Sequence, residues 1–254
     1  MSATPPVIVE APSCAHRKLD TVEIEAGSRV SEGTIDRMPT AVSYRLAFNR
    51  LAEVAQEMPE TDDPATDFVL QGDTLLVQAH AELAAAEAAN DGEAMAHAHQ
   101  AIDEAGGFDA RARAQAMLLG LGFRNAELDA PVNSFSGGWR MRLQLARALM
   151  CPADLMLLDE PTNHLDLDAL VWLEAWLQRY AGTLIIISHD REFLDTITRT
   201  TLHLDEAQLT RYSGNYTAFE EMRAERALQQ QANFAKQQER IAHLAGRHGR
   251  ACRG

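Results

Sequence analysis

The clearest hydrophobic pattern lies in the second half of the chain, where two short apolar runs flank an amphipathic segment. Leu155–Leu158 is wholly apolar and is followed at once by the polar pair Asp159 and Glu160, which is typical of a buried parallel strand. Residues 166–180 repeat apolar positions at helical spacing, and Thr183–Ile187 forms the second apolar run. Strand, helix and strand in this order predict an α/β core.

The first half carries mainly helical patterns. Residues 74–104 are rich in Ala, Glu and Leu with one break at residues 90–92, which predicts a helical hairpin with a tight turn. A further helix is predicted over about 108–119, where glycines end it. Alternation over Leu51–Gln56 indicates a short strand that ends by Pro59.

The two ends of the chain differ from this core. Residues 1–45 show no sustained period and at most one short strand, at Val22–Gly27. Thr200–Leu204 and Gln208–Tyr212 are predicted as two edge strands, and residues 216–246 as one long helix. That helix is polar nearly all round, so we expect it to project or to pair rather than to be buried.

Composition bounds the class of protein. A chain of 254 residues that is 46% hydrophobic can bury a sizeable core. Apolar runs stay well short of the roughly eighteen residues that span a membrane, and the N-terminal residues lack the pattern of a secretory signal. Three scattered cysteines argue against a disulfide framework or a zinc site. We therefore expect a cytoplasmic protein with no membrane span.

Charge is distributed unevenly along the chain. The formal net charge is −14, but residues 211–254 carry a net +4 and the residues before them a net −18. An acidic body does not coat nucleic acid, whereas a basic C-terminal segment can contact it. Ordinary solvated surface charge explains both values equally well.

Three segments carry candidate chemistry. Ser136, Gly137 and Gly138 precede a basic amphipathic helix over 139–150; a serine can cap such a helix, and its free N–H groups form an anion site. The same three residues also form a common turn.

Asp159 and Glu160 end one predicted strand, and His189 follows the next. Two adjacent carboxylates facing opposite ways can hold Mg²⁺ through water and polarise an attacking water. Ligands of open parallel sheets bind beyond the carboxyl ends of the strands. The acidic pair and His189 at two such ends therefore indicate a binding site more strongly than either feature alone. A surface histidine and a chance acidic pair remain the alternative.

A phosphate-binding loop of the form GxxxxGK[ST] is absent from the sequence. The chain contains two lysines, Lys18 and Lys236, and neither follows a glycine.

Three runs in order resemble the motifs of an ATP-binding cassette (ABC) protein. Phe135–Leu149 (FSGGWRMRLQLARAL) is similar to the signature motif, Leu155–Asp166 (LMLLDEPTNHLD) to the Walker B strand with its D-loop, and Ile185–Leu194 (IIISHDREFL) to the switch-histidine segment. The wording EPTNHLD and SHDREFLD resembles the F subfamily (ABC-F), soluble proteins with two cassettes in one chain. The resemblance covers about residues 47–246.

The resemblance implies an α/β fold: an incomplete ABC-type nucleotide-binding domain with a helical subdomain and an arm hairpin, followed by a long linker helix. It implies ATP and Mg²⁺ as ligands. The resemblance implies that Ser136, Gly137 and Gly138 contact the γ-phosphate of an ATP held by an opposing cassette. It also implies that Asp159 binds Mg²⁺ through water, that Glu160 is the general base and that His189 contacts the γ-phosphate. Asp166 would couple the two sites, and Gln56 would sense metal and water.

The resemblance also divides the chain. Residues 1–45 are unmatched or a remnant, residues 46–210 resemble the cassette core with its arm at about 74–104, and residues 211–254 resemble the start of the linker between cassettes. Family members place arm and linker against the ribosome and its bound tRNA. The implied partners are therefore a second cassette and the ribosome.

The missing phosphate loop and second cassette depart from the family pattern. The family is one of ATPases coupled to translation, but the loop supplies most of the N–H groups and the fixed cation that hold a triphosphate. We therefore expect a truncated form that does not bind ATP alone. Two alternatives stay open: a non-catalytic module that completes another cassette's site or binds RNA, and a cassette ATPase of chromosome-maintenance or repair type.

Overall fold

The computed structural model describes residues 7–10, 50–54, 58–205 and 208–251. The predicted strand at Val22–Gly27 and the glutamine Gln56 lie outside these residues. In chain order the elements are β1 (Val7–Glu10), β2 (Leu51–Glu53), α1 (Ala65–Leu70), α2 (Thr74–Ala89), α3 (Gly92–Glu104), α4 (Ala110–Gly120), η1 (Asn125–Glu127), η2 (Val132–Ser134), α5 (Gly137–Met150), β3 (Leu155–Asp159), α6 (Leu167–Leu177), β4 (Thr183–Ile187), α7 (Arg191–Ile197), β5 (Thr200–Asp205), β6 (Gln208–Ser213) and α8 (Tyr216–Ala251).

The described strands form one six-stranded sheet in the order β2-β3-β4-β1-β5-β6. Strands β2, β3 and β4 are parallel, so the two apolar runs lie side by side, with Leu155 opposite Thr183 and Asp159 opposite Ile187. The buried parallel strands and the α/β core predicted from the sequence are confirmed. Strand β1 was not predicted: it pairs antiparallel with both β4 and β5, in a segment expected to lack regular structure.

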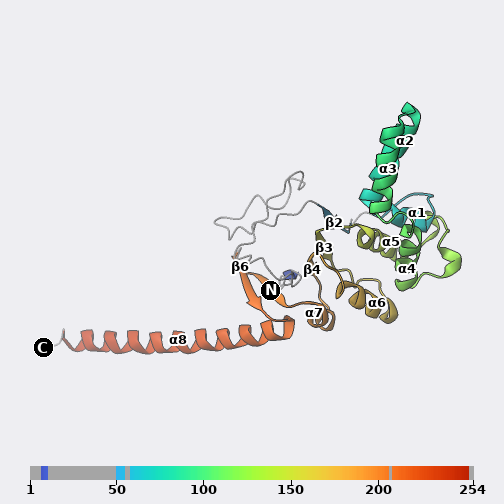
Figure 1. Cartoon of the computed structure of the whole chain (residues 1–254). Helices are drawn as coiled ribbons and strands as arrows, with labels where there is room; N and C mark the ends of the chain where they lie inside the picture. Colours follow the sequence, from blue (N-terminus) through green and yellow to red (C-terminus); the bar gives the residue numbers. More distant parts are fainter. Residues whose placement is uncertain (1–6, 11–49, 55–57, 206–207, 252–254) are drawn as a thin grey trace.

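A helical subdomain made of α1, α4 and α5 packs beside the β2 side of this sheet (Figure 1). Its core and that of the sheet form one cluster of buried apolar side chains. Members that are at most 2% exposed include Val69, Leu118, Leu121, Leu143, Met156, Leu158, Leu173, Ile186 and Phe193. The sequence pattern supplies this core because α5, β3 and β4 each carry apolar side chains where they face one another.

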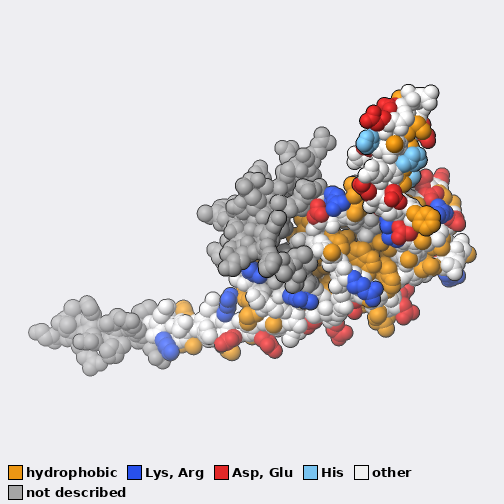
Figure 2. Space-filling model, in the orientation of Figure 1, with side chains coloured by type: hydrophobic (Ala, Val, Ile, Leu, Met, Phe, Trp, Pro, Cys, Tyr) orange, Lys and Arg blue, Asp and Glu red, His pale blue; other side chains and the backbone are white. Residues whose placement is uncertain are grey.

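Helices α2 and α3 form the predicted hairpin, which projects from the helical subdomain (Figure 1). Asn90 adopts a left-handed backbone (φ 56°) that ends α2, and the Asp91 carboxylate accepts hydrogen bonds from the N–H groups of Glu93 and Ala94 to begin α3. The break at residues 90–92 is thus a tight turn, as predicted. Figure 2 shows acidic and histidine side chains along the hairpin, and residues 74–104 contain no Lys or Arg.

Helix α8 extends away from the body in another direction (Figure 1). Its first turns pack on the body, where Phe219 is buried against Tyr212 and His203. From residue 223 to residue 238 every side chain is exposed, which confirms the predicted projecting helix.

The helical subdomain meets the sheet-covering helix α6 through a contact that only glycine permits. A Cβ atom at Gly120, the last residue of α4, would lie 2.0 Å from Cε2 of Trp172 on α6. By contrast, a Cβ at Gly92 in the hairpin would meet nothing within 4 Å.

We expect Gly120→Ala to lower the free energy of unfolding by about 1–3 kcal/mol, because the indole must move out of a packed position. The matched Gly92→Ala variant should stay within about 0.5 kcal/mol of the parent, since it adds a methyl group in open space. Urea unfolding followed by circular dichroism measures both. Equal stabilities for the two variants would show that the Trp172 contact is not tight.

Candidate functional site

Ser136, Gly137 and Gly138, called here the signature residues, stand at the N-terminus of α5. Ser136 occupies the N-cap position and its C=O accepts from Arg140 N–H, yet its hydroxyl makes no capping hydrogen bond to the helix. The expected side-chain cap is therefore absent. Because the hydroxyl is not used to close the first turn, this helix end keeps N–H groups that can receive an anion.

Both signature glycines lie against neighbouring segments. A Cβ at Gly137 would lie 2.7 Å from the Met58 methyl carbon, and one at Gly138 would lie 3.6 Å from Cβ of His164. The second contact brings the signature residues next to the loop 160–166, which follows β3. His164 itself has a left-handed backbone with φ of 67°.

Arg142 connects α5, which begins at the signature residues, to the loop 160–166. Its Nε donates to the carbonyl of His164 at 2.8 Å, and its NH1 donates to Leu121 O at 3.0 Å and to Asp166 Oδ2 at 3.1 Å. The guanidinium also lies 4.4 Å from the ring centroid of Trp139. Only 10% of the Arg142 side chain is exposed, so these contacts are made largely out of water and fix the helix relative to the loop.

Asp166 has two structural partners here. Its Oδ1 accepts from the N–H of Ala169 and so begins α6, and its Oδ2 accepts from Arg142. The Ala169 N–H, followed by the Arg142 side chain, lowers the pKa of Asp166 below its ordinary value. The carboxylate is therefore charged at neutral pH and links α5 to α6.

The ends of β3 and β4 bring Glu160 and His189 together. Glu160 has a left-handed backbone (φ 48°), and its N–H donates to Ile187 O at 2.8 Å, which continues the pairing of the two strands. The N–H of His189 donates to Glu160 Oε2 at 3.3 Å, and Nε2 of the imidazole lies 3.4 Å from Oε1. The expectation that adjacent strand ends place these side chains together is met.

Glu160 Oε1 is buried and has no hydrogen-bond donor within the described part of the chain. A buried carboxylate oxygen without a donor is costly, and such atoms are frequent where a ligand or water completes the network.

A cleft of about 300 Å³ joins the strand end to the signature helix. Its lining comes from β3, the loop after it, α5 and the segment after β2. The lining residues are Val54, Met141, Arg142, Leu145, Asp159, Glu160, Pro161, Asn163, His164 and Leu165. Asp159 and Glu160 line this cleft, whereas the three signature residues are not among its lining residues.

Sequence reasoning missed Arg142 and His164. Arg142 follows Gly138 by one helical turn within an otherwise buried stretch of α5, and a charged residue in such a run requires partners. That signal is visible in the sequence, although the partners, Leu121, His164 and Asp166, are not.

The site lacks two features that hold nucleotides or metals in other proteins. The sequence holds no GxxxxGK[ST] loop, and the described residues contain no group of three or more His, Cys, Asp or Glu side chains that could hold a metal by themselves.

Comparison with known families decides the identity of this fold. A family model described as ABC transporter matches residues 24–163, and a second, also described as ABC transporter, matches residues 202–246. The chain belongs to the ATP-binding cassette family. Its α/β cassette fold is therefore established, and within the described residues we find no helix long and apolar enough to cross a membrane.

Curated relatives of this cassette include proteins named for sub-family F. The probable ATP-binding protein YheS of Escherichia coli (strain K12) is 52% identical over 195 residues, which cover 77% of this chain and 31% of YheS. YheS of Haemophilus influenzae is 49% identical over the same share. The ATP-binding cassette sub-family F member 3 of Homo sapiens is 41% identical over 83% of this chain and 31% of its own length. The chain thus spans about a third of the relatives it matches.

Proposed function

We propose that this cassette acts as one half of a shared ATP site. Its signature residues complete a nucleotide held by a second cassette, within an ABC-F-type ATPase. One observation supports the proposal: the chain has all three signature residues but lacks a phosphate-binding loop. The second cassette is a further domain of the same protein or another protein.

The signature residues are suited to binding an incoming phosphate. The Ser136 hydroxyl is not engaged in capping, and the two glycines after it add no side chain of their own to the first turn of α5. A helix N-terminus attracts phosphate through these N–H groups and through its dipole. Arg142 would hold this helix end in register with the loop 160–166, so that Asp166 and the signature residues approach a partner cassette together.

The strand-end residues have the chemistry of the hydrolytic half-site. We propose Asp159 as the carboxylate that binds Mg²⁺ through water, Glu160 as the general base and His189 as the γ-phosphate contact, with Gln56 at the metal and attacking water. Positioning and charge neutralisation account for most of the catalysis of phosphoryl transfer. Without the loop and its lysine, however, these carboxylates repel a triphosphate, so we expect no ATP turnover by this chain alone.

We expect a fluorescent ATP analogue with Mg²⁺ to bind the isolated chain more weakly than about 1 mM, because the fixed cation and most phosphate donors are missing. Equilibrium titration followed by fluorescence anisotropy measures this. The probable ATP-binding protein YheS serves as the control, and Glu160→Gln, which removes one repelling carboxylate, should bind no more weakly than the parent. Micromolar affinity for the isolated chain would refute the shared-site proposal.

We extend the proposal to the ribosome as partner. Residues 211–254 carry a net +4, and α8 presents its side chains to solvent from residue 223 to residue 238, which suits contact with RNA phosphates. The ABC-F resemblance adds the hairpin as a second contact and translation as the process.

Ribosome co-sedimentation tests this part separately. We expect the double variant Arg211→Gln/Arg223→Gln to reduce the bound fraction severalfold at low salt, since phosphate contacts depend on charge and weaken as salt rises. The control Arg179→Gln removes an exposed arginine from the body instead and should bind as the parent does. No co-sedimentation, or equal binding of all three proteins, would favour a different cassette class, such as the repair type.

A further inference from the structure

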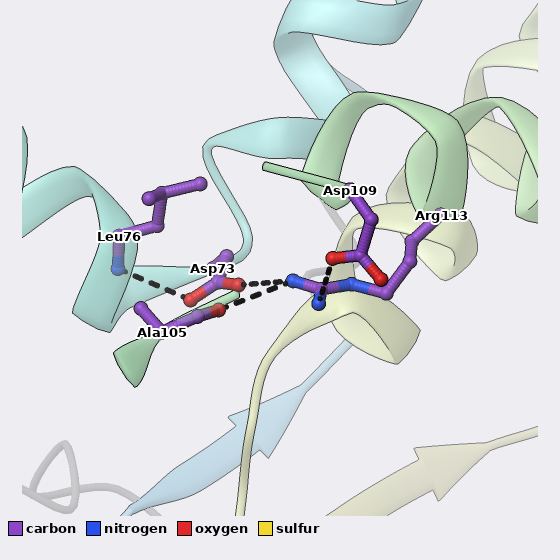
Figure 3. A network of polar contacts seen from close by, with 5 residues as sticks. All are labelled: Asp73, Leu76, Ala105, Asp109 and Arg113. Carbon is purple, nitrogen blue, oxygen red and sulfur yellow. Dashed lines mark hydrogen bonds and ion pairs between the residues drawn. The ribbon is translucent and has the colours of Figure 1, made fainter. Parts of the chain in front are cut away.

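The α2–α3 hairpin joins the body through two chain crossings that lie next to α4 (Figure 3). At the first crossing, Asp73 begins α2: its Oδ1 accepts from Leu76 N–H at 3.1 Å. Its Oδ2 lies 3.2 Å from NH2 of Arg113, on α4. The Asp73 side chain is only 5% exposed, so this carboxylate depends on the arginine for its charge partner.

The same arginine holds the second crossing, where α3 ends. NH2 of Arg113 also donates to the carbonyl of Ala105 at 3.3 Å, and NH1 donates to Asp109 Oδ1 at 2.7 Å (Figure 3). Gly106 adopts a left-handed backbone (φ 67°), and a Cβ there would lie 2.6 Å from NH1. The turn after α3 therefore wraps the guanidinium closely.

The hairpin base is also packed against α5, the helix that carries the signature residues. A Cβ at Gly72, one residue before Asp73, would lie 1.9 Å from the backbone oxygen of Arg147. Backbone meets backbone at this point, so the base of α2 cannot tilt toward α5 without displacing it.

We propose that Arg113 is a clamp that makes the hairpin a rigid extension of the helical subdomain. One planar guanidinium joins the start of α2, the end of α3 and α4, which a flexible ammonium cannot do. A load at the hairpin tip is then transmitted to the body that holds the signature helix instead of being absorbed by bending at the base. The clamp is a property of this chain and does not depend on nucleotide or ribosome binding.

Hydrogen exchange on the full chain tests the clamp, with Arg113→Gln as the variant. We expect amides at the base, in residues 74–77 and 105–107, to exchange about tenfold faster, because a charge-assisted contact to a buried carboxylate is lost. Amides at the tip, residues 90–94, should be unchanged. The matched control is Arg111→Gln on the same helix, which breaks exposed ion pairs with Asp67 and Asp129 that do not involve the hairpin.

A distance measurement tests rigidity directly. Spin labels on Ala89→Cys near the tip and Ala126→Cys on the body, both exposed positions, should give a narrow distance distribution in a variant with the three native cysteines replaced. We expect Arg113→Gln to broaden it, and Arg113→Lys, which keeps the charge and the fold, to broaden it less. If Arg113→Gln and Arg111→Gln give the same exchange at the base and the same distance distribution as the parent, Arg113 is not a clamp.

Discussion

A single guanidinium, that of Arg142, connects the parts of this cassette that a partner would meet. It fastens α5 to the loop 160–166 and to the N-cap of α6, and it stacks on an indole of its own helix. Without it, the signature residues and the residues after β3 would be held only by separate packing contacts. The surface that we propose for a second cassette is thus held by one nearly buried cation, whose Nε and NH1 both donate hydrogen bonds.

The chemistry at the ends of β3 and β4 depends on which groups the chain contains and which it lacks. Glu160 and His189 meet because β3 and β4 are parallel neighbours, and their side chains leave the same edge of the sheet. A triphosphate also requires amide donors and a fixed cation, and neither of the two lysines of the chain belongs to a GxxxxGK[ST] sequence. Because the carboxylates lack these amide donors and this cation, the chain is better suited to contribute to a shared site than to catalyse on its own.

Much of the fold was predictable from local pattern, because apolar runs, helical periods and turn residues act over a few positions. β3, β4, the hairpin turn at residues 90–92 and the projecting α8 follow from such signals. Strand β1 was not predicted, because its four residues pair with strands some 180 positions away and their own sequence does not indicate that pairing. For the same reason, the sequence located the strand-end residues and the signature residues, but not the arginines that hold the structure around them.

The central claim is that the signature face of this chain completes an ATP site on another cassette. The most direct test measures the ATPase rate of a cassette that carries a GxxxxGK[ST] loop, alone and with increasing amounts of this chain. The account predicts a saturable rise that Ser136→Arg abolishes and that the surface control Arg179→Gln leaves intact. A rate that this chain does not change, or that Ser136→Arg raises equally, would contradict it.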